Sequence, residues 1–260
     1  YRYDGGRTWA YCGNPGHRVT NPVVFNGKLY LCSLDGGDMT YYDGESWTAI
    51  GKLADVSQTY GFAVHEGNLY SSSWLNGEVF RYDGKRSWIR SVRLGNEMVV
   101  MGMAVYNGKL YAGTLPLAEV YRYDGDEAWL STGRLDKTPG VRYRRAWSMA
   151  VYRGKLYCGT LPSGHVYSIE AGKLVSHDHA LPSGWVHLAA VKDRDRLKLY
   201  VDGKLAARSS VFESGEYDIS NDRPMRIGFG AHDYFNGSMR DLRVYGRALG
   251  EAEIADLAVP

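Results

Sequence analysis

Residues 98–133 read MVVMGMAVYNGKLYAGTLPLAEVYRYDGDEAWLSTG, and this stretch decides the fold. Its first nine residues are almost wholly apolar, which predicts a strand buried on both faces. Asn107-Gly108 then predicts a hairpin, because a type I′ turn needs positive φ at both central positions. Asp124-Gly125 marks a second turn. Three further strands are expected, over residues 110–114, 119–123 and 129–133. The stretch therefore predicts one four-stranded antiparallel sheet in about forty residues.

The same unit recurs through the first two-thirds of the chain. Its markers are an Asp-Gly turn, a tryptophan, and the glycine of a Gly-x-Leu-Tyr turn. They occur at Asp4, Asp43, Asp83 and Asp124; at Trp9, Trp47, Trp88 and Trp129; and at Gly27, Gly67, Gly108 and Gly154. A period near forty without a helical pattern predicts the blades of a β-propeller. Asp before Gly stabilises a turn and Trp packs between blades, so neither series is expected to be catalytic.

Composition excludes several classes of function. The chain has 260 residues and a net charge of +2 with acids and bases interspersed, so no cationic surface for nucleic acid is expected. No apolar run approaches the length of a membrane span. The three cysteines, Cys12, Cys32 and Cys158, lack metal-ligand spacing. We expect buried free thiols, with a Cys12–Cys32 disulfide as the alternative.

The first Asp-Gly-Trp copy, residues 4–9 (DGGRTW), resembles the Asp box of sialidase-type propellers, and the later copies are degenerate, kelch-like versions. In those families the Asp box is a structural turn away from the active site. The resemblance therefore implies a fold more than an activity. The chain begins inside a repeat, so we expect further blades upstream, with ring closure within these residues as the alternative.

The Asp-Gly-Trp pattern stops after Gly172, and a different pattern follows. Its segments are GWVHLAAV at 184–191, LKLYVDGK at 197–204, MRIG at 225–228, YFNGSMRDLRVY at 234–245 and RAL at 247–249. These segments resemble the C-terminal half of a laminin-G-like, concanavalin A-like jelly roll. The alternating residues 185–190, 197–201 and 242–245 predict strands on their own, and Glu251 to Leu257 predicts one or two helical turns.

We therefore predict an all-β chain with three parts: propeller blades over 1–172, a junction over 173–184 and a jelly-roll portion over 185–260. Half a sandwich exposes an apolar face, which is unstable alone. Its missing strands are expected upstream of Tyr1; packing of the 185–203 hairpin on the blades is the alternative.

The predicted ligand site lies where the repeat is interrupted. Arg142, Tyr143, Arg145 and Trp147 occupy an insertion just before an innermost strand. Tyr60 and Arg18 precede the corresponding strands of other repeats. Entries to inner strands line the funnel of a propeller, and Arg with aromatic residues suits a sugar or an anionic sugar. A solvated basic loop is the alternative.

Metal sites are not predicted. His177 and His179 would point to one side of a strand and Asp178 to the other. By resemblance to calcium-binding jelly rolls such as pentraxins, Asp233 could bind Ca²⁺, but no partner ligands are identifiable. No other cofactor is expected.

The modules imply a non-catalytic protein of the cell exterior, periplasm or cell surface that binds a glycan or glycoprotein or mediates adhesion. That expectation rests on resemblance, because both folds host many functions. The alternatives are a sialidase-like glycoside hydrolase of which this chain is an incomplete part, and a structural scaffold that binds proteins. No carboxylate pair can be assigned as catalytic from the sequence.

Overall fold

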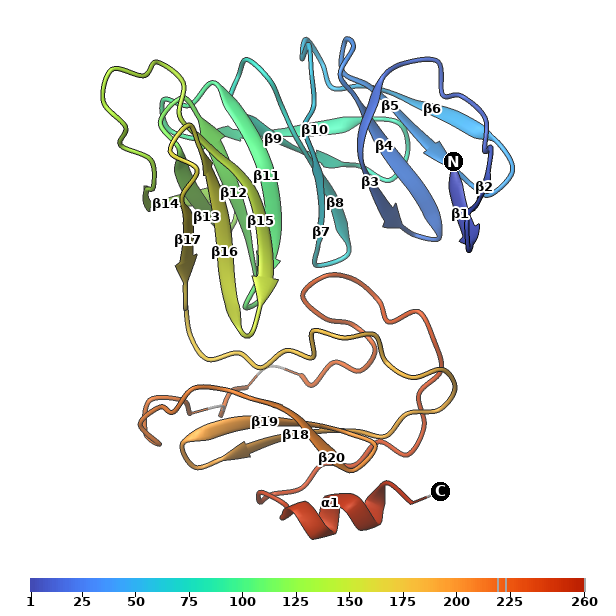
Figure 1. Cartoon of the computed structure of the whole chain (residues 1–260), viewed down its shortest axis with the longest axis vertical. Helices are drawn as coiled ribbons and strands as arrows, with labels where there is room; N and C mark the ends of the chain where they lie inside the picture. Colours follow the sequence, from blue (N-terminus) through green and yellow to red (C-terminus); the bar gives the residue numbers. More distant parts are fainter. Residues whose placement is uncertain (219, 223, 260) are drawn as a thin grey trace. The chain divides into compact units, whose positions relative to one another are not determined.

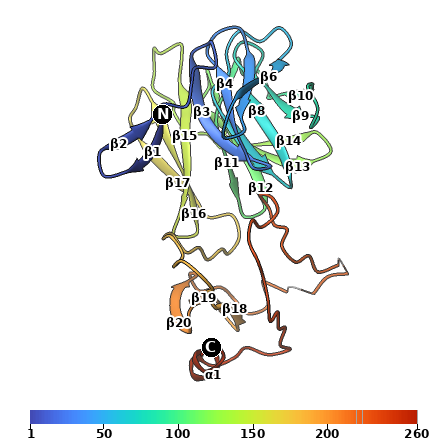
Figure 2. The same cartoon turned by 90° about the vertical axis from the view of Figure 1, so that its right-hand side faces the viewer.

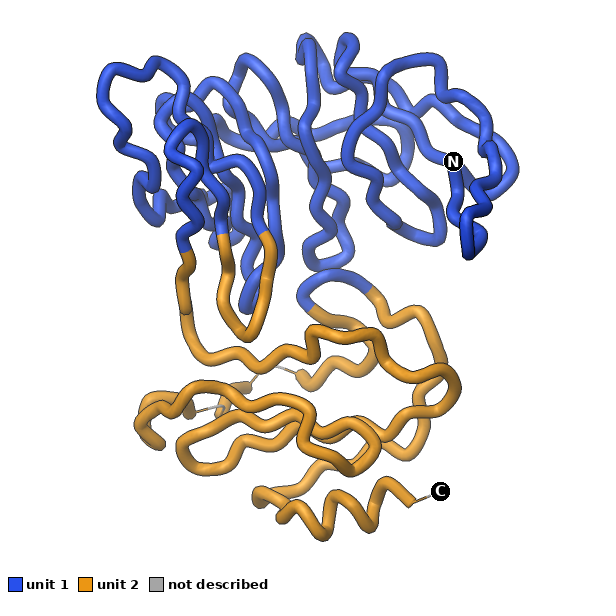
Figure 3. Tube along the Cα trace, viewed as in Figure 1, with its two compact units in different colours: residues 1–149, 158–167, 231–233 blue, residues 150–157, 168–230, 234–260 orange. Residues whose placement is uncertain are grey.

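The computed structural model describes residues 1–218, 220–222 and 224–259. The described chain is all-β apart from one short helix (Figure 1). It divides into two compact units, coloured in Figure 3. Unit 1 contains Tyr1–Met149, Cys158–Tyr167 and Ala231–Asp233; unit 2 contains Ala150–Tyr157, Ser168–Gly230 and Tyr234–Pro260.

The blades are separate antiparallel sheets, each built from consecutive strands (Figures 1 and 2). A two-stranded hairpin comes first, of β1 (Arg2–Gly5) and β2 (Thr8–Ala10). Three four-stranded sheets follow: β3 (Val19–Phe25), β4 (Lys28–Ser33), β5 (Asp38–Tyr42) and β6 (Trp47–Lys52); β7 (Phe62–His65), β8 (Asn68–Ser72), β9 (Glu78–Tyr82) and β10 (Trp88–Arg93); β11 (Val99–Tyr106), β12 (Lys109–Leu115), β13 (Glu119–Gly125) and β14 (Ala128–Arg134). A three-stranded sheet of β15 (Arg145–Tyr152), β16 (Lys155–Leu161) and β17 (Val166–Ile169) ends the series, and the boundary between the units crosses it.

The turn predictions are confirmed. Asn107 and Gly108 have φ angles of 46° and 74°, both positive as a type I′ turn requires. The same pair of positive angles occurs at the other three turn glycines and the residues before them. The four strands predicted from residues 98–133 form the sheet β11–β14 in sequence order.

The core of unit 1 lies between neighbouring blades. One cluster joins Phe25 and Met39 of the first four-stranded sheet to Phe80 of the second. Another joins Tyr70 of the second sheet to Leu110 of the third. The innermost strand β7 lies beside both β3 and β11. Burying each of these side chains contributes about 1.5–3 kcal/mol, so stacking of blades stabilises the unit.

In the sheets that begin at β3, β7, β11 and β15, a buried hydroxyl links the end of the second strand to the start of the third or to the segment that leads to it. In the sheet β11–β14, Thr114 Oγ1 donates to the carbonyl of Glu119 at 2.9 Å and accepts from the Glu119 N–H at 3.1 Å. Ser73 makes the same two bonds with Glu78, and Ser33 makes them with Asp35. Thr160 Oγ1 donates to the carbonyl of His165. We call this series the hydroxyl clamps: Ser33, Ser73, Thr114 and Thr160.

The Asp-Gly turns behave as predicted in two copies. Asp43 Oδ1 accepts from the N–H groups of residues 45 and 46, and Asp83 Oδ1 does so from residues 85 and 87. These backbone hydrogen bonds lower the pKa of both carboxyls. In the other two copies, Asp4 and Asp124 instead pair with an arginine two residues earlier.

The repeated tryptophans have a partner within their own blade. Each lies at an angle to a tyrosine of the preceding strand, with ring centroids 4.9 to 5.1 Å apart. The pairs are Tyr3–Trp9, Tyr42–Trp47, Tyr82–Trp88 and Tyr123–Trp129. Trp88 also packs against the cluster between the first two four-stranded sheets, which agrees with the expected packing between blades.

Unit 2 contains a smaller sheet and the helix. Its strands are β18 (Leu188–Asp193), β19 (Arg196–Val201) and β20 (Lys204–Arg208), and its helix is α1 (Glu251–Leu257). The helix confirms the prediction for residues 251–257. Ile254 is fully buried, and a Cβ on Gly203 would lie 3.0 Å from Ala255 Cα, so the helix packs on the β19–β20 turn.

Two details of the jelly-roll prediction are wrong. Residues 242–245 form no strand, although they alternate, and the strand predicted from Trp185 begins at Leu188. A strand needs a hydrogen-bonding neighbour, and none of the described residues pairs with 242–245. Consequently Leu242 is 57% exposed and Val244 is 76% exposed.

The cysteines are free thiols in the structure, with Cys32 and Cys158 buried and Cys12 partly buried. Burial raises the pKa of Cys32, and it raises that of Cys158 to about 11. Both side chains therefore act as small packing groups rather than as nucleophiles.

Candidate functional site

Aromatic side chains gather in unit 1 where the inner strands begin. Tyr60 precedes β7 and Trp147 lies on β15, and their ring centroids are 6.2 Å apart in an edge-to-face arrangement. Trp74, just after β8, lies 5.9 Å from Tyr60. Tyr60, Trp74 and Tyr143 all pack against the buried apolar cluster around Met101. We call Tyr60, Trp74, Tyr143 and Trp147 the aromatic cluster.

Two glycines let the strand that carries Trp147 approach its neighbours. A Cβ on Gly102 of β11 would lie 2.8 Å from the carbonyl oxygen of Trp147, and one on Gly113 of β12 would lie 2.3 Å from that of Ala146. Any larger residue would push β15 away from the third blade. The close approach fixes the backbone of Trp147, and the residue stays 43% exposed.

Polar groups surround the aromatic rings. The Tyr60 hydroxyl donates to Gln58 Oε1 at 2.8 Å, and Asn21 Nδ2 donates to the Tyr60 carbonyl. Burial raises the pKa of Tyr60, and the nearby positive charge of Arg145 opposes that rise. The site therefore combines an exposed indole face, a neutral phenol, an amide and a guanidinium. Such groups stack and exchange hydrogen bonds, which is the chemistry of binding.

The residues predicted for the ligand site divide into two groups. Tyr60, Tyr143, Arg145 and Trp147 lie in or beside the aromatic cluster. Arg18 instead forms an ion pair with Asp35, whose carboxylate it contacts at 2.5 Å and 2.9 Å.

Arg142, exposed to solvent, places its guanidinium 5.0 Å from the ring centre of Tyr143 in a cation–π contact. Its neighbour Arg144 is held by the protein, because Arg144 Nε donates to the Thr138 carbonyl at 2.7 Å. The insertion therefore contributes both a fixed and a solvated arginine.

Trp74 was not predicted, although the sequence carries a signal for it. It follows the clamp residue Ser73, and the residues after the other three clamps are Leu34, Leu115 and Leu161. Trp74 therefore places an indole where the other repeats carry leucine, which marks a departure from the repeated scaffold.

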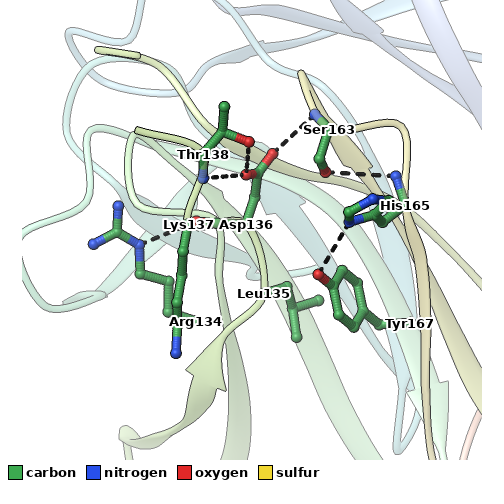
Figure 4. Close-up of a pocket in the computed structure, with 8 residues that line it drawn as sticks. All are labelled: Arg134, Leu135, Asp136, Lys137, Thr138, Ser163, His165 and Tyr167. Atoms are coloured by element: carbon green, nitrogen blue, oxygen red, sulfur yellow. Dashed lines mark hydrogen bonds between the residues drawn. The ribbon is translucent and has the colours of Figure 1, made fainter. Parts of the chain in front are cut away.

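A second candidate site in unit 1 is a pocket of about 460 Å³ (Figure 4). It lies between the loop after β14 and the segment that enters β17. The lining residues are Arg134, Leu135, Asp136, Lys137, Thr138, Ser163, His165 and Tyr167. We call it the loop pocket. Its size is in the usual range for small-ligand sites.

Asp136 holds the loop pocket together. The residue is 1% exposed. Its Oδ1 accepts from the Thr138 N–H at 2.9 Å and from the Thr138 hydroxyl at 2.6 Å, and its Oδ2 accepts from the Ser163 N–H at 3.1 Å. Burial alone would raise the pKa of Asp136, but these hydrogen bonds outweigh it and hold the pKa far below the usual range. The carboxylate is therefore ionised and ties the two walls to each other.

Cationic and aromatic side chains form the rest of the loop pocket. Arg134 Nε donates to the Asp136 carbonyl at 3.2 Å, and Lys137 is exposed. His165 Nδ1 lies 3.3 Å from the Tyr167 hydroxyl, as Figure 4 shows. The prediction missed this pocket because Asp136 and Ser163 are far apart in sequence, and only the folding of adjacent sheets brings them together.

A tyrosine–glutamate pair of the kind sialidases use as a nucleophile occurs on strand β13, where Glu119 lies opposite Arg134 of β14. The Tyr121 hydroxyl donates to Glu119 Oε2 at 2.6 Å on strand β13. Tyr121 is 7% exposed. Burial and, second, the Glu119 charge raise the pKa of this phenol. A nucleophilic tyrosine needs the opposite shift, so the pair is structural.

The described residues contain no group of three or more His, Cys, Asp or Glu side chains arranged to hold a metal ion. Asp178 accepts hydrogen bonds from the Arg153 N–H and the Ser176 hydroxyl, which tie it to the chain. Among the described helices, none has the length and apolarity needed to cross a membrane.

Comparison with solved structures finds chains of low identity. Virginiamycin B lyase from Staphylococcus aureus is 11% identical, over 76% of this chain and 68% of that one, with a TM-score of 0.48. The computationally designed Ika4 protein is 14% identical, over 65% of this chain and all of that one, at 0.45. The extracellular domain of a protein assigned as a hybrid two-component system of B. thetaiotaomicron is 15% identical, over 59% of this chain and 21% of that one, at 0.47. Likeness at this level carries no argument about function.

No curated protein matches the chain. A family model does match: residues 128–255 correspond to the concanavalin A-like lectin/glucanase superfamily of the laminin-G type. The match supports the resemblance seen after Gly172. The matched region also begins earlier than Gly172, at the first residue of β14, and therefore includes β14 and the whole sheet β15–β17. The chain thus combines propeller blades with a region that matches the concanavalin A-like superfamily.

Proposed function

We propose that the chain is a non-catalytic carbohydrate-binding protein whose aromatic cluster contacts a sugar of a glycan or glycoprotein. The observation that carries the proposal is the exposed indole of Trp147 beside Tyr60, with Gln58 and Arg145 at the edge of the rings. The apolar face of a pyranose stacks on an indole, while its hydroxyls need the mixed donors and acceptors found around this one.

Two further observations support a binding role. The matched superfamily is described as one of lectins and glucanases. The one tyrosine–glutamate pair discussed above is buried and has its phenol held protonated, which disfavours the sialidase-like alternative. A carbohydrate-binding role also agrees with the expected location at the cell exterior, in the periplasm or at the cell surface, which we include in the proposal.

The test is a glycan array followed by calorimetry on the chain and its variants. Trp147→Ala should weaken binding of the selected glycan at least about tenfold, since a central aromatic contact is worth roughly 2 kcal/mol. Trp147→Phe should retain most of the affinity because it keeps an aromatic face.

The matched control is Trp9→Ala, which removes another exposed tryptophan, 59% exposed and outside the cluster. Thermal unfolding of each variant checks that it is folded. The proposal fails if the chain binds no glycan on the array, or if Trp9→Ala weakens binding as much as Trp147→Ala does.

A further inference from the structure

The loop pocket is not used by the function proposed above, and its chemistry differs from that of the aromatic cluster. Its walls carry two cations, Arg134 and Lys137, against one carboxylate, Asp136. The carboxylate accepts three hydrogen bonds from the protein. Asp136 thus shapes the pocket. Burial raises the pKa of the Glu97 carboxyl, and the charge of Arg134 also acts on that carboxyl and opposes the rise. The terminal nitrogens of Arg134 and the exposed Lys137 ammonium can still contact a ligand.

The two cations have unused hydrogen-bonding capacity. Arg134 is anchored through Nε alone, and its terminal nitrogens have no hydrogen bond or ion pair within the described part of the chain. Lys137 has no side-chain partner among the same residues, and it is exposed at the rim. An anchored guanidinium with free terminal donors is suited to a carboxylate, which it can bind through two oxygens.

The other lining residues suit a hydroxylated ring rather than a bare ion. Leu135 and the Tyr167 ring give an apolar surface, and His165 and the hydroxyls of Thr138 and Ser163 give polar groups at its edge. Figure 4 shows the Tyr167 and His165 rings across from the Asp136 loop. A volume of about 460 Å³ is far more than a simple inorganic anion needs.

We infer that the loop pocket binds an acidic monosaccharide of the hexuronate class, with its carboxylate at Arg134 and Lys137 and its ring against Leu135 and Tyr167. The cationic pair recognises the carboxylate, and the imidazole of His165 contacts ring hydroxyls. The inference does not depend on the aromatic cluster, because every residue it uses lies between Arg134, at the end of β14, and Thr138, or on the segment from Ser163 to Tyr167.

The experiment titrates the full chain with sodium glucuronate, glucose and sodium acetate, followed by NMR of ¹⁵N-labelled protein. Glucuronate should shift amide signals of residues 134–138 and 163–167, and should bind at least about tenfold more tightly than glucose or acetate. Lys137→Gln should weaken glucuronate binding severalfold and reduce its dependence on salt. Lys85→Gln, which changes an exposed lysine in another blade, should leave it unchanged.

Three results would overturn the inference: glucuronate binding no tighter than glucose, acetate binding as tight as glucuronate, or equal weakening by both lysine variants. Trp147→Ala separates the two proposals. It should leave glucuronate binding in the loop pocket intact even where it abolishes binding of a neutral glycan, and loss of both would refute an independent pocket. Unfolding curves confirm that Lys137→Gln is folded, and Arg134→Gln provides a second variant with the same expected direction.

Discussion

The hydrogen bonds to Asp136 allow a worked prediction for Asp136→Asn. The native carboxylate accepts from the Thr138 N–H, the Thr138 hydroxyl and the Ser163 N–H. An amide keeps one acceptor oxygen and replaces the other with a donor. If that donor faces the Ser163 N–H, one hydrogen bond to a charged group is lost, and if it faces Thr138, two are lost.

The smaller of these losses sets the expected magnitude. A hydrogen bond to a charged group is worth about 1.5–3 kcal/mol. At about 2–4 °C per kcal/mol for a domain of this size, the melting temperature at pH 7 should fall by roughly 3–12 °C. The variant keeps the shape of the side chain, so the change reports on the lost acceptor and charge rather than on a cavity.

The same variant should show a defined pH dependence. The pKa of Asp136 is lowered in the folded state, so its stabilisation is fully present above the ordinary carboxyl pKa of about 3.9 and is lost as the pH falls below that value. The difference in unfolding free energy between the native chain and Asp136→Asn should therefore be constant from pH 7 to about pH 5 and shrink at lower pH.

Urea and thermal unfolding followed by circular dichroism provide the assay. Asp126→Asn is the control: residue 126 is exposed and has a φ of 47°, which asparagine adopts readily, so its unfolding should change little. If Asp136→Asn unfolds at the native temperature at pH 7, the carboxylate does not hold the pocket walls together and the reasoning above is wrong.

Two other substitutions test how the blades pack. Glu97 is fully buried and accepts a hydrogen bond from the Leu117 N–H. Burial raises its pKa, so its ionised form destabilises the folded state once the pH rises above the ordinary glutamate pKa of about 4.3. The urea midpoint of Glu97→Gln minus that of the native chain should therefore be larger at pH 7 than at pH 4. The same difference at both pH values would contradict the raised pKa. Gly113→Ala should destabilise the chain by about 1–3 kcal/mol because its Cβ would lie 2.3 Å from the Ala146 carbonyl oxygen. Gly215→Ala, where a Cβ meets nothing within 4 Å, is the control, and equal melting temperatures for the two variants would show that the blades adjust to the added methyl group.

The blades were predictable because their information is local. Asn107-Gly108 selects a turn type by itself, and the apolar run before it selects a buried strand. Residues 242–245 show the limit of the same reasoning. Their alternation predicts a strand, but a strand forms only against a neighbour, and alternation does not say whether that neighbour is present.

The candidate sites were predictable only in part. Tyr60, Tyr143 and Trp147 could be grouped because the repeat places the entry of each inner strand at one end of the blade. Ser163 and Asp136 belong to different blades and meet through a backbone N–H, which leaves no pattern in residue type. The sequence likewise cannot show that Arg18 forms an ion pair with Asp35, because that contact depends on the path of the chain between them.

The hydroxyl clamps bear on how such a chain can evolve. Each clamp closes within a single blade, so a duplicated segment of forty residues carries its own closure with it and needs no new partner elsewhere. The longer step from Thr114 to Thr160 shows that extra residues can enter between blades while each clamp keeps its hydroxyl-to-carbonyl hydrogen bond. New loops, and with them new pockets, can therefore be added at the junctions of such a propeller while the repeated framework stays intact.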